Sequence, residues 1–439
     1  MYFIYRILTA ISVVFLAPYY ALRAWRRGEA FALGERLGRL PSEMGGRRPT
    51  GRSAIWIHAV SVGEVLAAKP LAEALRQRFA SRIVFVSTTT ETGQRLARER
   101  LTSVDGIFYF PLDWVVPVRR ALRTICPALV IVMETEIWPN FLREAHQQKV
   151  PVIFVNARIS ERSFARYQRW QFLVGPFYSR VLADAELFLA QSPADATRLA
   201  EMGAPEDRIE VTGNLKYDSD QPDISPFGVW LEGEIQRQER WPVIVAGSVV
   251  ADEEEAVLAG YDIVQRRWRR ALLILAPRKP DRFDLAASIA AERGWKVIRR
   301  SRLNLDGPLD ETADVLVLDT IGELAGLYLL ADAVFIGGSL VPAGGHNILE
   351  PAWFAKAPVF GPSMENFRDM ATQFLKAHAA IEVTSGPQLG RVWVQLIEDS
   401  GLRERVGRAA RELSERNRGA TRRSVERIAA VLSRREQLG

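Results

Sequence analysis

The sequence contains one cysteine, Cys126, among 439 residues. A single cysteine cannot form an intrachain disulfide or a cysteine-rich zinc site, and such low usage is typical of a reducing compartment. The histidines, at positions 58, 146, 346 and 378, lack the spacing of metal ligands. We therefore expect neither a bound metal nor a cofactor.

Several familiar motifs are also missing. There is no Gly-x-x-x-x-Gly-Lys-Ser/Thr loop and no Gly-x-Gly-x-x-Gly after a strand, which argues against a nucleotide triphosphatase and a dehydrogenase. The Gly-x-Ser-x-Gly elbow of serine hydrolases is absent. No long stripe of aromatic and basic side chains is present, so we expect no nucleic-acid partner. The net charge of +6 favours contact with anionic surfaces without naming one.

Short apolar runs alternate with amphipathic segments from Ser53 onward. Hydrophobic residues make up 48% of the chain, enough for the cores of two or three domains. The alternation predicts parallel sheets covered by helices on both faces. The candidate strands are Ala54 to Val60, Ile83 to Thr88, Ile107 to Phe110, Leu129 to Met133, Val152 to Val155, Leu187 to Ala190, Ile209 to Thr212, Val243 to Ala246, Leu272 to Ala276, Lys296 to Ile298, Val315 to Leu318 and Ala333 to Ile336, with short runs near Val359 and Ile381.

A polar, proline-containing stretch at 214–241 interrupts this rhythm and is predicted to be a linker. It separates two predicted Rossmann-like domains, 28–213 and 242–402. The linker contains Asp218-Ser219-Asp220, which matches the Asp-x-Asp of metal-dependent sugar transferases, but its position argues against a metal site. The charged segment 403–439 is predicted to be helical and to pack on a domain face.

Residues 1–27 are predicted to form a membrane anchor. The run from Ile7 to Leu22 carries no charge, and Arg23, Trp25, Arg26 and Arg27 follow it. Its 16 residues fall short of the roughly 18 wanted for a confident span, so it either crosses the membrane or lies in the interface. A buried core helix is the alternative. If the segment crosses, the arginines place everything after it in the cytoplasm.

The first candidate site follows the first predicted strand, where Ser61, Gly63 and Glu64 open a helix. A carboxylate there can act as a general base if its surroundings raise its pKa towards neutrality. A helix N-terminus lowers that pKa, so burial would have to offset the dipole. The alternative is a first-turn acidic residue that only stabilises its helix.

Three further groups of polar residues follow predicted strands of the first domain. Glu134 and Glu136 follow the fourth strand, where they could bind acceptor hydroxyls, steady a developing cation, or cap a helix. Arg158 and Arg162 follow the fifth strand and could meet anionic substrate groups. Lys216 ends the Gly213-Asn214-Leu215-Lys216 segment.

The second domain contains a glycine-rich stretch, Phe335 to Ala352, that joins a strand to a helix. Its glycine pairs at 337–338 and 344–345 precede His346, Asn347 and Glu350. Exposed backbone N–H groups beside a helix N-terminus can hold an anion, so we interpret the stretch as a nucleotide site. Structural glycines in a turn are the alternative.

Two other strand ends could contribute to this site. Arg278, Lys279 and Arg282 lie within five positions after one strand, where a phosphate or carboxylate is their natural partner. A solvated helix start is the alternative. The segment Asp319-Thr320-Ile321-Gly322-Glu323-Leu324 follows another strand and again places a Gly-Glu pair where a nucleotide could bind.

Together these segments resemble the 3-deoxy-D-manno-octulosonic acid (Kdo) transferases of lipopolysaccharide assembly. The resemblance covers nearly the whole chain and rests on the N-terminal anchor, Ser-Val-Gly-Glu at 61–64, Glu-Thr-Glu-Ile-Trp-Pro-Asn at 134–140, Asn-Ala-Arg-Ile-Ser at 156–160, Gly-Asn-Leu-Lys at 213–216, Pro-Arg-Lys-Pro-Asp-Arg-Phe at 277–283 and the stretch 335–352. It implies a GT-B fold, with two Rossmann-like domains facing across a cleft. It also implies an inverting transfer of Kdo from CMP-Kdo to a lipid A precursor (lipid IVA-like) at the cytoplasmic face of the inner membrane.

The same resemblance implies roles for individual residues. Glu64 is expected to be the base that deprotonates the acceptor hydroxyl, with Glu134 and Lys216 assisting in the transition state. The residues expected to bind CMP are Pro277, Arg278, Ile321, Gly322, Glu323, Asn347, Ile348, Leu349 and Glu350. Further candidate contacts to donor or acceptor are Ser61, Glu136, Arg158, Arg162, Ser248, Lys279, Gly338, Ser339, Gly345 and His346.

One segment departs from the family pattern. Where the family usually reads Ser-Thr-His followed by acidic residues, this chain reads Ser248-Val249-Val250 and then Asp252, Glu253 and Glu254. A donor contact by that histidine is absent or replaced here. Two alternatives therefore remain: a GT-B transferase that uses another nucleotide-sugar, and a catalytically inactive protein that binds lipopolysaccharide precursors.

Overall fold

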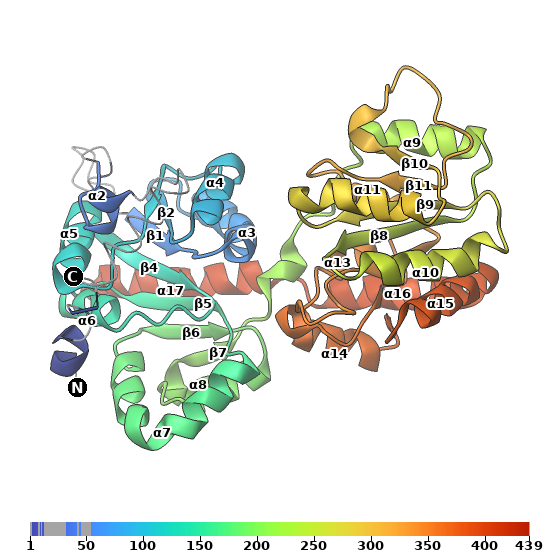
Figure 1. Ribbon diagram of the computed structural model, residues 1–439. Coiled ribbons are helices and arrows are strands. Elements are labelled where there is room, and N and C mark those ends of the chain that lie inside the picture. The colour runs from blue at the N-terminus through green and yellow to red at the C-terminus, as the bar shows by residue number, and fades with distance from the viewer. Residues whose placement is uncertain are drawn as a thin grey trace. The chain divides into compact units, whose positions relative to one another are not determined.

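The computed structural model describes residues 2–7, 9, 11–12, 32–41, 44 and 54–438. The chain forms two compact units (Figure 1). Unit 1 comprises Met1–Ser219 with Asn417–Gly439, and unit 2 comprises Asp220–Arg416. Within the described residues, each unit contains one seven-stranded sheet in which all strand pairs are parallel. The predicted α/β class with two parallel sheets is confirmed.

The sheet of unit 1 has the strand order β3-β2-β1-β4-β5-β6-β7. Its central strands are apolar and buried along their length, as expected of a parallel sheet covered on both faces. The strands are β1 (Ala54–His58), β2 (Ile83–Thr88), β3 (Gly106–Tyr109), β4 (Pro127–Met133), β5 (Val152–Ala157), β6 (Leu187–Ala190) and β7 (Ile209–Val211).

Alternate side chains of these strands enter two different cores, because successive residues of a strand point to opposite faces. Ile55 and Ile57 pack with α3 (Val62–Arg78), α4 (Glu91–Arg100) and α17 (Ala420–Leu438). Ala54 and Trp56 belong to the core on the opposite face. The helices contributing to that core are α5 (Val115–Ile125), α6 (Pro139–Gln147), α7 (Glu161–Leu182) and α8 (Pro193–Glu201).

The sheet of unit 2 has the order β10-β11-β9-β8-β12-β13-β14. Its strands are β8 (Val243–Val249), β9 (Leu272–Pro277), β10 (Val297–Arg299), β11 (Val315–Val317), β12 (Ala333–Ile336), β13 (Val359–Phe360) and β14 (Ile381–Glu382). One face packs against α10 (Glu254–Gln265), α11 (Phe283–Glu292) and α15 (Gly386–Glu398). The remaining helices are α9 (Pro226–Arg237), α12 (Leu324–Leu327), α13 (Leu349–Trp353), α14 (Arg368–Lys376) and α16 (Ser400–Arg416).

The sequence predicted that residues 403–439 form one helical segment packed on a domain face. In the structure this part of the chain is divided between the two units. Helix α16 belongs to unit 2, whereas α17 returns to unit 1, where Ile428 and Leu432 enter the core beside α3 (Figure 1). The carboxylate of Asp218 accepts the backbone N–H groups of Gly419 and Thr421 at 2.5 Å each. Asp218 thus caps the start of α17, and its side chain has a structural partner.

The expected linker 214–241 is also shorter in the structure. Helix α9 begins at Pro226, and the Ser225 hydroxyl accepts the N–H of Gly228 at 3.1 Å as its N-cap. Phe227 and Leu231 are buried. Serine followed by proline is a favourable helix start, so these residues form part of unit 2.

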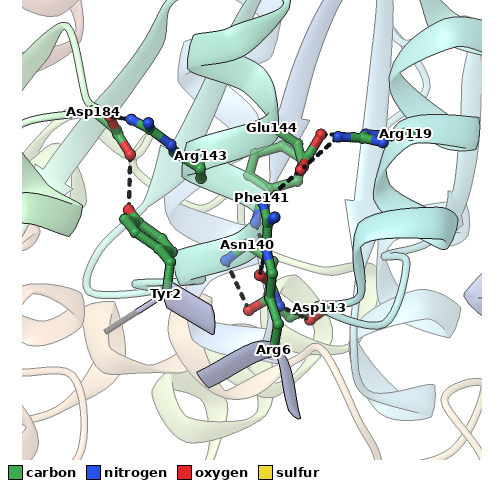
Figure 2. Close-up of polar contacts among 9 residues, drawn as sticks. All are labelled: Tyr2, Arg6, Asp113, Arg119, Asn140, Phe141, Arg143, Glu144 and Asp184. Atoms are coloured by element: carbon green, nitrogen blue, oxygen red, sulfur yellow. Dashed lines mark hydrogen bonds and ion pairs between the residues drawn. The ribbon is translucent and has the colours of Figure 1, made fainter. Parts of the chain in front are cut away.

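Residues 2–7 are helical and contact unit 1 through polar side chains (Figure 2). Most of the predicted anchor, 1–27, lies outside the described residues. Among the residues that are described, no helix has both the length and the apolar character needed to cross a membrane. The three interpretations of this segment, a spanning helix, an interfacial helix and a buried core helix, therefore stay predictions.

Candidate active site

The order of the strands in unit 1 reverses between β1 and β4, which lie side by side although β2 and β3 separate them in sequence. Ligands of open α/β sheets bind at the carboxyl ends of the strands at such a switch point. Glu64 follows β1 and Glu134 follows β4. The fold therefore brings together two of the carboxylates singled out in the sequence.

Glu64 lies in the first turn of α3 and is 7% exposed. Its carboxylate accepts the backbone N–H of Val60 at 2.8 Å and the hydroxyl of Ser61 at 2.9 Å. Burial raises the pKa of Glu64 to about 7, although both hydrogen bonds oppose the rise, and the charges of Glu134 and Glu136 add to it. Burial within unit 1 thus outweighs the hydrogen bonds that favour the charged form. A carboxylate with this pKa can accept a proton near neutrality.

The two other carboxylates lie in the Glu134–Trp138 loop, which joins β4 to α6. Glu134 adopts φ +53°, and its N–H donates to the carbonyl of Val155 at 3.0 Å. This left-handed conformation turns the chain sharply at the end of the strand. Glu136 is half-buried, and burial followed by the charge of Glu134 raises its pKa.

Lys216 completes the charged group in unit 1. The 3-10 turn Leu215–Asp218 carries it, and the side chain of Asn156 accepts the Leu215 N–H at 2.9 Å. Burial lowers the pKa of Lys216, while the negative charges of Glu134 and Glu64 raise it. Lys216 therefore lies within electrostatic reach of both carboxylates.

Asn156 is a site-supporting residue that sequence reasoning did not assign. It is fully buried at the end of β5 with φ +59°, and the pairing of β5 with β6 is irregular at this point. Asparagine tolerates the left-handed region better than most residues. An asparagine directly after an apolar strand was the available signal, but its partner lies 59 positions later.

The remaining candidates of unit 1 lie at different distances from this group. Ser61 contacts Glu64 directly. The positive charge of Arg158 lowers the pKa of Lys216, so Arg158 belongs to the same cluster. Arg162 instead lies exposed on α7 and lines a groove with Arg166, Arg169 and Trp170.

An apolar pocket of about 410 Å³ opens beside Glu136. Its lining includes the aromatic side chains of Trp138, Tyr167, Trp170 and Tyr178, together with Arg166. Such a combination of aromatic walls and a few charged groups suits an amphiphilic ligand.

In unit 2 the switch point lies between β8 and β12, which are neighbours in the sheet. Glu253, after β8, is fully buried. Its carboxylate accepts the backbone N–H groups of Gly338 at 2.6 Å, Ser339 at 2.8 Å and Leu340 at 2.8 Å, and that of Val250 at 3.1 Å. A buried carboxylate thus organises the loop that follows β12.

These bonds change the interpretation of the glycine-rich stretch. The sequence suggested that its backbone N–H groups hold an anionic ligand, but three of them already donate to Glu253. Ser339 is fully buried, and its hydroxyl donates to the carbonyl of Ile336 and accepts the N–H of Gly361. These groups serve the internal structure, because a protein carboxylate occupies the place of an anion.

The two candidate glycines fit tightly into the same loop. Gly338 adopts φ +69°, and an added Cβ would lie 2.9 Å from the ring of His346. Gly345 adopts φ +71°, and an added Cβ would lie 2.3 Å from the sulfur of Met364. Both positions therefore require glycine for conformation and for close packing. The Gly345 N–H donates to the Gly338 carbonyl at 2.7 Å, which joins the two ends of the loop.

Four other candidates interact with one another at this loop. Burial raises the pKa of Glu350 to about 7, against the hydrogen bond from Asn347 and the charge of Arg278. Asn347 donates to Glu350 at 3.3 Å and accepts the Leu349 N–H at 3.1 Å. Burial and the charge of Arg278 lower the pKa of His346 to about 4, so this histidine is neutral at pH 7. Arg278 itself is exposed.

The side chains of the other donor candidates differ in what they can offer. Ile321 is 80% exposed beside Gly322, which adopts φ +95°. Glu323 forms an ion pair with Arg300 at 3.0 Å, a partner that the sequence did not reveal. The remaining positions fall into three groups: Ile348, Leu349 and Pro277 are buried, Lys279 is exposed, and Ser248 is half-buried with φ +55°.

The third basic residue of the 278–282 segment is committed to a structural partner. Arg282 donates to the buried carboxylate of Glu254 at 2.7 and 3.0 Å. Within the described residues, no group of three or more histidine, cysteine, aspartate or glutamate side chains is placed to hold a metal ion.

Two parallel-sheet α/β units, each with charged residues at its switch point, resemble the GT-B class of glycosyltransferases. The structure is similar to a UDP-GlcNAc 2-epimerase from Neisseria meningitidis, with a TM-score of 0.55 and 14% identity over 86% of this chain and all of that one. At this identity the likeness concerns the fold alone.

Sequence comparison gives the family. Residues 32–219 match the family model for 3-deoxy-D-manno-octulosonic-acid transferase (kdotransferase). The chain is 34% identical to the 3-deoxy-D-manno-octulosonic acid transferase of Haemophilus influenzae, covering 87% of each protein. It is 33% identical to that of Bordetella pertussis, covering 94% of this chain and 96% of the relative. The chain therefore belongs to the 3-deoxy-D-manno-octulosonic acid transferase family and is a glycosyltransferase.

Proposed function

We propose that the protein transfers Kdo from CMP-Kdo to a hydroxyl group of a lipid A precursor, with inversion at the anomeric carbon. Family membership over most of the chain supports the sugar and the reaction class. The observation that carries the mechanism is the buried carboxylate of Glu64, whose pKa of about 7 suits a general base. The donor nucleotide and the acceptor follow from the resemblance to the family.

In the proposed reaction, Glu64 removes the proton of the acceptor hydroxyl. The acceptor oxygen forms a bond to the anomeric carbon of Kdo while the bond from that carbon to the CMP phosphate oxygen breaks. CMP leaves with the electron pair of the broken bond, and attack from the opposite side inverts the configuration. A monophosphate leaving group does not need a diphosphate-bound metal ion.

Glu134 and Lys216 are proposed to act on the charges that develop during this step. Bond breaking gives the sugar oxocarbenium character, which the carboxylate of Glu134 can stabilise. Lys216 lies within electrostatic reach of Glu134 and Glu64, so both carboxylates attract its positive charge, which can also meet an anionic group of the donor. Neither role requires a group that the chain does not supply.

The proposed CMP site in unit 2 comprises Arg278, Asn347 and Glu350. Arg278 is exposed beside Glu350 and His346, where its guanidinium can bind the phosphate. Glu350 and Asn347 are the groups proposed to bind the ribose hydroxyls. The backbone of the loop after β12 is proposed to shape this site rather than to bind the phosphate, since Glu253 accepts its N–H groups.

We also propose that unit 1 contacts the cytoplasmic face of the inner membrane. Helix α7 is basic and carries exposed apolar residues: Trp170 is 56% and Leu173 68% exposed, and Phe172 is fully exposed. Arg162, Arg166 and Arg169 lie on the same helix. Exposed aromatic and basic side chains on one helix are typical of binding to anionic lipid surfaces. The predicted anchor at residues 1–27 would add to this contact.

A transfer assay tests the proposal. The full chain, in detergent micelles, is incubated with CMP-Kdo and a tetraacylated lipid A precursor, and the product is read by mass spectrometry. We expect a Kdo-bearing lipid, and competition by CMP but not by UDP. Competition by UDP and a product from a UDP-sugar would favour another GT-B transferase, and CMP binding with no transfer would favour an inactive precursor-binding protein.

A further inference from the structure

The helix formed by residues 2–7 is fixed to unit 1 by three side chains that contact different parts of it. The hydroxyl of Tyr5 donates to Asp113 at 2.8 Å, and the guanidinium of Arg6 donates to Glu144 at 2.8 Å. The hydroxyl of Tyr2 donates to Asp184 at 2.7 Å. Figure 2 shows the contacts of Tyr2 and Arg6.

Two of these contacts converge on the first turn of α6. Asp113 accepts the N–H of Asn140 at 3.1 Å and that of Phe141 at 2.7 Å (Figure 2). Its backbone carbonyl accepts the side-chain amide of Asn140 at 2.6 Å. Arg6 donates to the side-chain oxygen of Asn140 at 3.4 Å. Tyr5 and Arg6 therefore both act on this one helix start.

The first turn of α6 depends on Asp113 because its own N-cap offers no acceptor. Trp138 occupies the N-cap position, and its side chain makes no capping bond. A helix start without a cap leaves N–H groups unpaired, and Asp113 fills this role from a distant part of the chain. Burial raises the pKa of Asp113, while the bonds from Tyr5, Asn140 and Phe141 lower it. The Tyr5 hydroxyl thus helps to keep this cap charged.

This helix start continues directly from the Glu134–Trp138 loop. Trp138 ends the loop and occupies the N-cap position of the helix, and its backbone carbonyl accepts the Leu142 N–H at 3.0 Å. Any shift of the first turn of α6 therefore moves the loop that carries Glu134 and Glu136. Arg6 supports the second turn as well, because it shares the buried carboxylate of Glu144 with Arg119 (Figure 2).

We propose that Tyr5 and Arg6 are positioning residues for the Glu134–Trp138 loop, which they hold in place through Asp113 and the first turn of α6. The start of the predicted anchor is then a fixed part of unit 1. It does more than tether the protein, because it sets the geometry of the carboxylates. This inference rests on the proposed function for the role of Glu134, but the positioning can be measured separately.

The test compares Tyr5→Phe with Tyr2→Phe in the full chain. Both changes remove one phenolic hydroxyl from the same helix. Both rings also contact Phe177, with ring centroids 5.5 Å apart. Tyr2, however, binds Asp184, whose side chain reaches α6 at Arg143, outside the first turn of that helix. Arg6→Gln serves as a second variant on the Tyr5 side.

Turnover and hydrogen exchange are then measured in detergent micelles, where membrane attachment does not limit the reaction. We expect Tyr5→Phe and Arg6→Gln to lower kcat roughly tenfold with KM for CMP-Kdo unchanged, as expected when a reacting group is misplaced. Amide exchange in the peptide 134–142 should accelerate in both variants. Tyr2→Phe should match the wild type in kcat and in exchange of that peptide.

Two results would overturn the inference: wild-type exchange of 134–142 in Tyr5→Phe, or an equal effect of Tyr2→Phe on exchange and kcat. If the wild type makes no Kdo product, the proposed function fails, but the exchange of 134–142 still decides whether Tyr5 and Arg6 hold the loop.

Discussion

The carboxylate of Glu253 accepts the backbone N–H of Gly338 at 2.6 Å, across 85 positions of sequence. The same carboxylate accepts three further backbone N–H groups, and all four lie at the carboxyl ends of β8 and β12. The loop of unit 2 that carries the candidate donor residues is therefore ordered by an internal acid before any nucleotide binds. This contact joins the glycine-rich stretch to the segment after Ser248, which is the segment that differs from the family pattern.

Glu253→Gln should weaken both unit 2 and CMP binding. A glutamine has one acceptor oxygen in place of two, and each carboxylate oxygen of Glu253 accepts two of the four backbone N–H groups. Two of these N–H groups therefore lose their partner. We expect a loss of about 2–4 kcal/mol in the free energy of unfolding. Chemical denaturation and calorimetry with CMP measure the two effects.

The matched control is Glu255→Gln, because Glu255 is exposed and pairs with Arg293 on the surface. It should change stability by less than about 1 kcal/mol. Equal effects of the two substitutions would contradict the role given to Glu253.

The rate of the proposed reaction should depend on pH through Glu64. With a folded pKa of about 7 in the free protein, this carboxyl is protonated and inactive as a base at lower pH, so kcat/KM should fall about tenfold per unit below pH 7. Ser61→Ala removes a hydrogen bond that lowers this pKa and should move the midpoint of the profile upwards. A midpoint that stays in place, or moves down, argues against Glu64 as the titrating group.

The same pKa makes a prediction about stability. Burial raises the pKa of Glu64 above its usual value of 4.5, so folding favours the protonated form. The stabilisation is present below about pH 4.5 and is lost as the pH rises through 7. The unfolding free energy of the wild type relative to Glu64→Gln should therefore fall by about 3 kcal/mol between pH 4.5 and pH 8, as measured by denaturation at both values. A rise over this range would have the wrong sign for a buried acid.

Asn156→Ala should lower kcat while leaving CMP affinity unchanged. The substitution removes the acceptor of the Leu215 N–H and places alanine at φ +59°. Lys216 would lose its fixed position, and unit 1 should lose about 1–3 kcal/mol of stability. Kinetics, calorimetry with CMP and denaturation test the three parts. A selective loss of CMP affinity with normal kcat would refute the link to Lys216.

The basic face of α7 should contribute to lipid binding. Arg166→Glu reverses a charge beside Trp170, so sedimentation with anionic vesicles should fall several-fold at low salt and less at high salt. Arg411→Glu on α16 is the control, because Arg411 is an exposed arginine of unit 2 with one surface partner. The same loss in both variants would assign the binding to net charge rather than to α7.

The sequence predicted the strands better than the contacts between distant residues. All fourteen strand regions occur, because an apolar run between polar turns is a local signal in a parallel sheet. The candidate residues after β1, β4 and β12 were found for the same reason. The structural roles of Asn156, Arg300 and Glu253 depend on partners that lie far away in sequence. No local sequence pattern reveals such pairs. The return of α17 to unit 1 likewise depends on which core accepts an amphipathic helix.

The clearest test of Glu64 as general base is a comparison of binding and turnover in Glu64→Gln. We expect this variant to bind CMP with the affinity of the wild type, because the proposed nucleotide site lies in unit 2. Transfer of Kdo from CMP-Kdo to the tetraacylated precursor should fall at least about a hundredfold. Turnover close to that of the wild type, at unchanged CMP affinity, would show that Glu64 is not the general base.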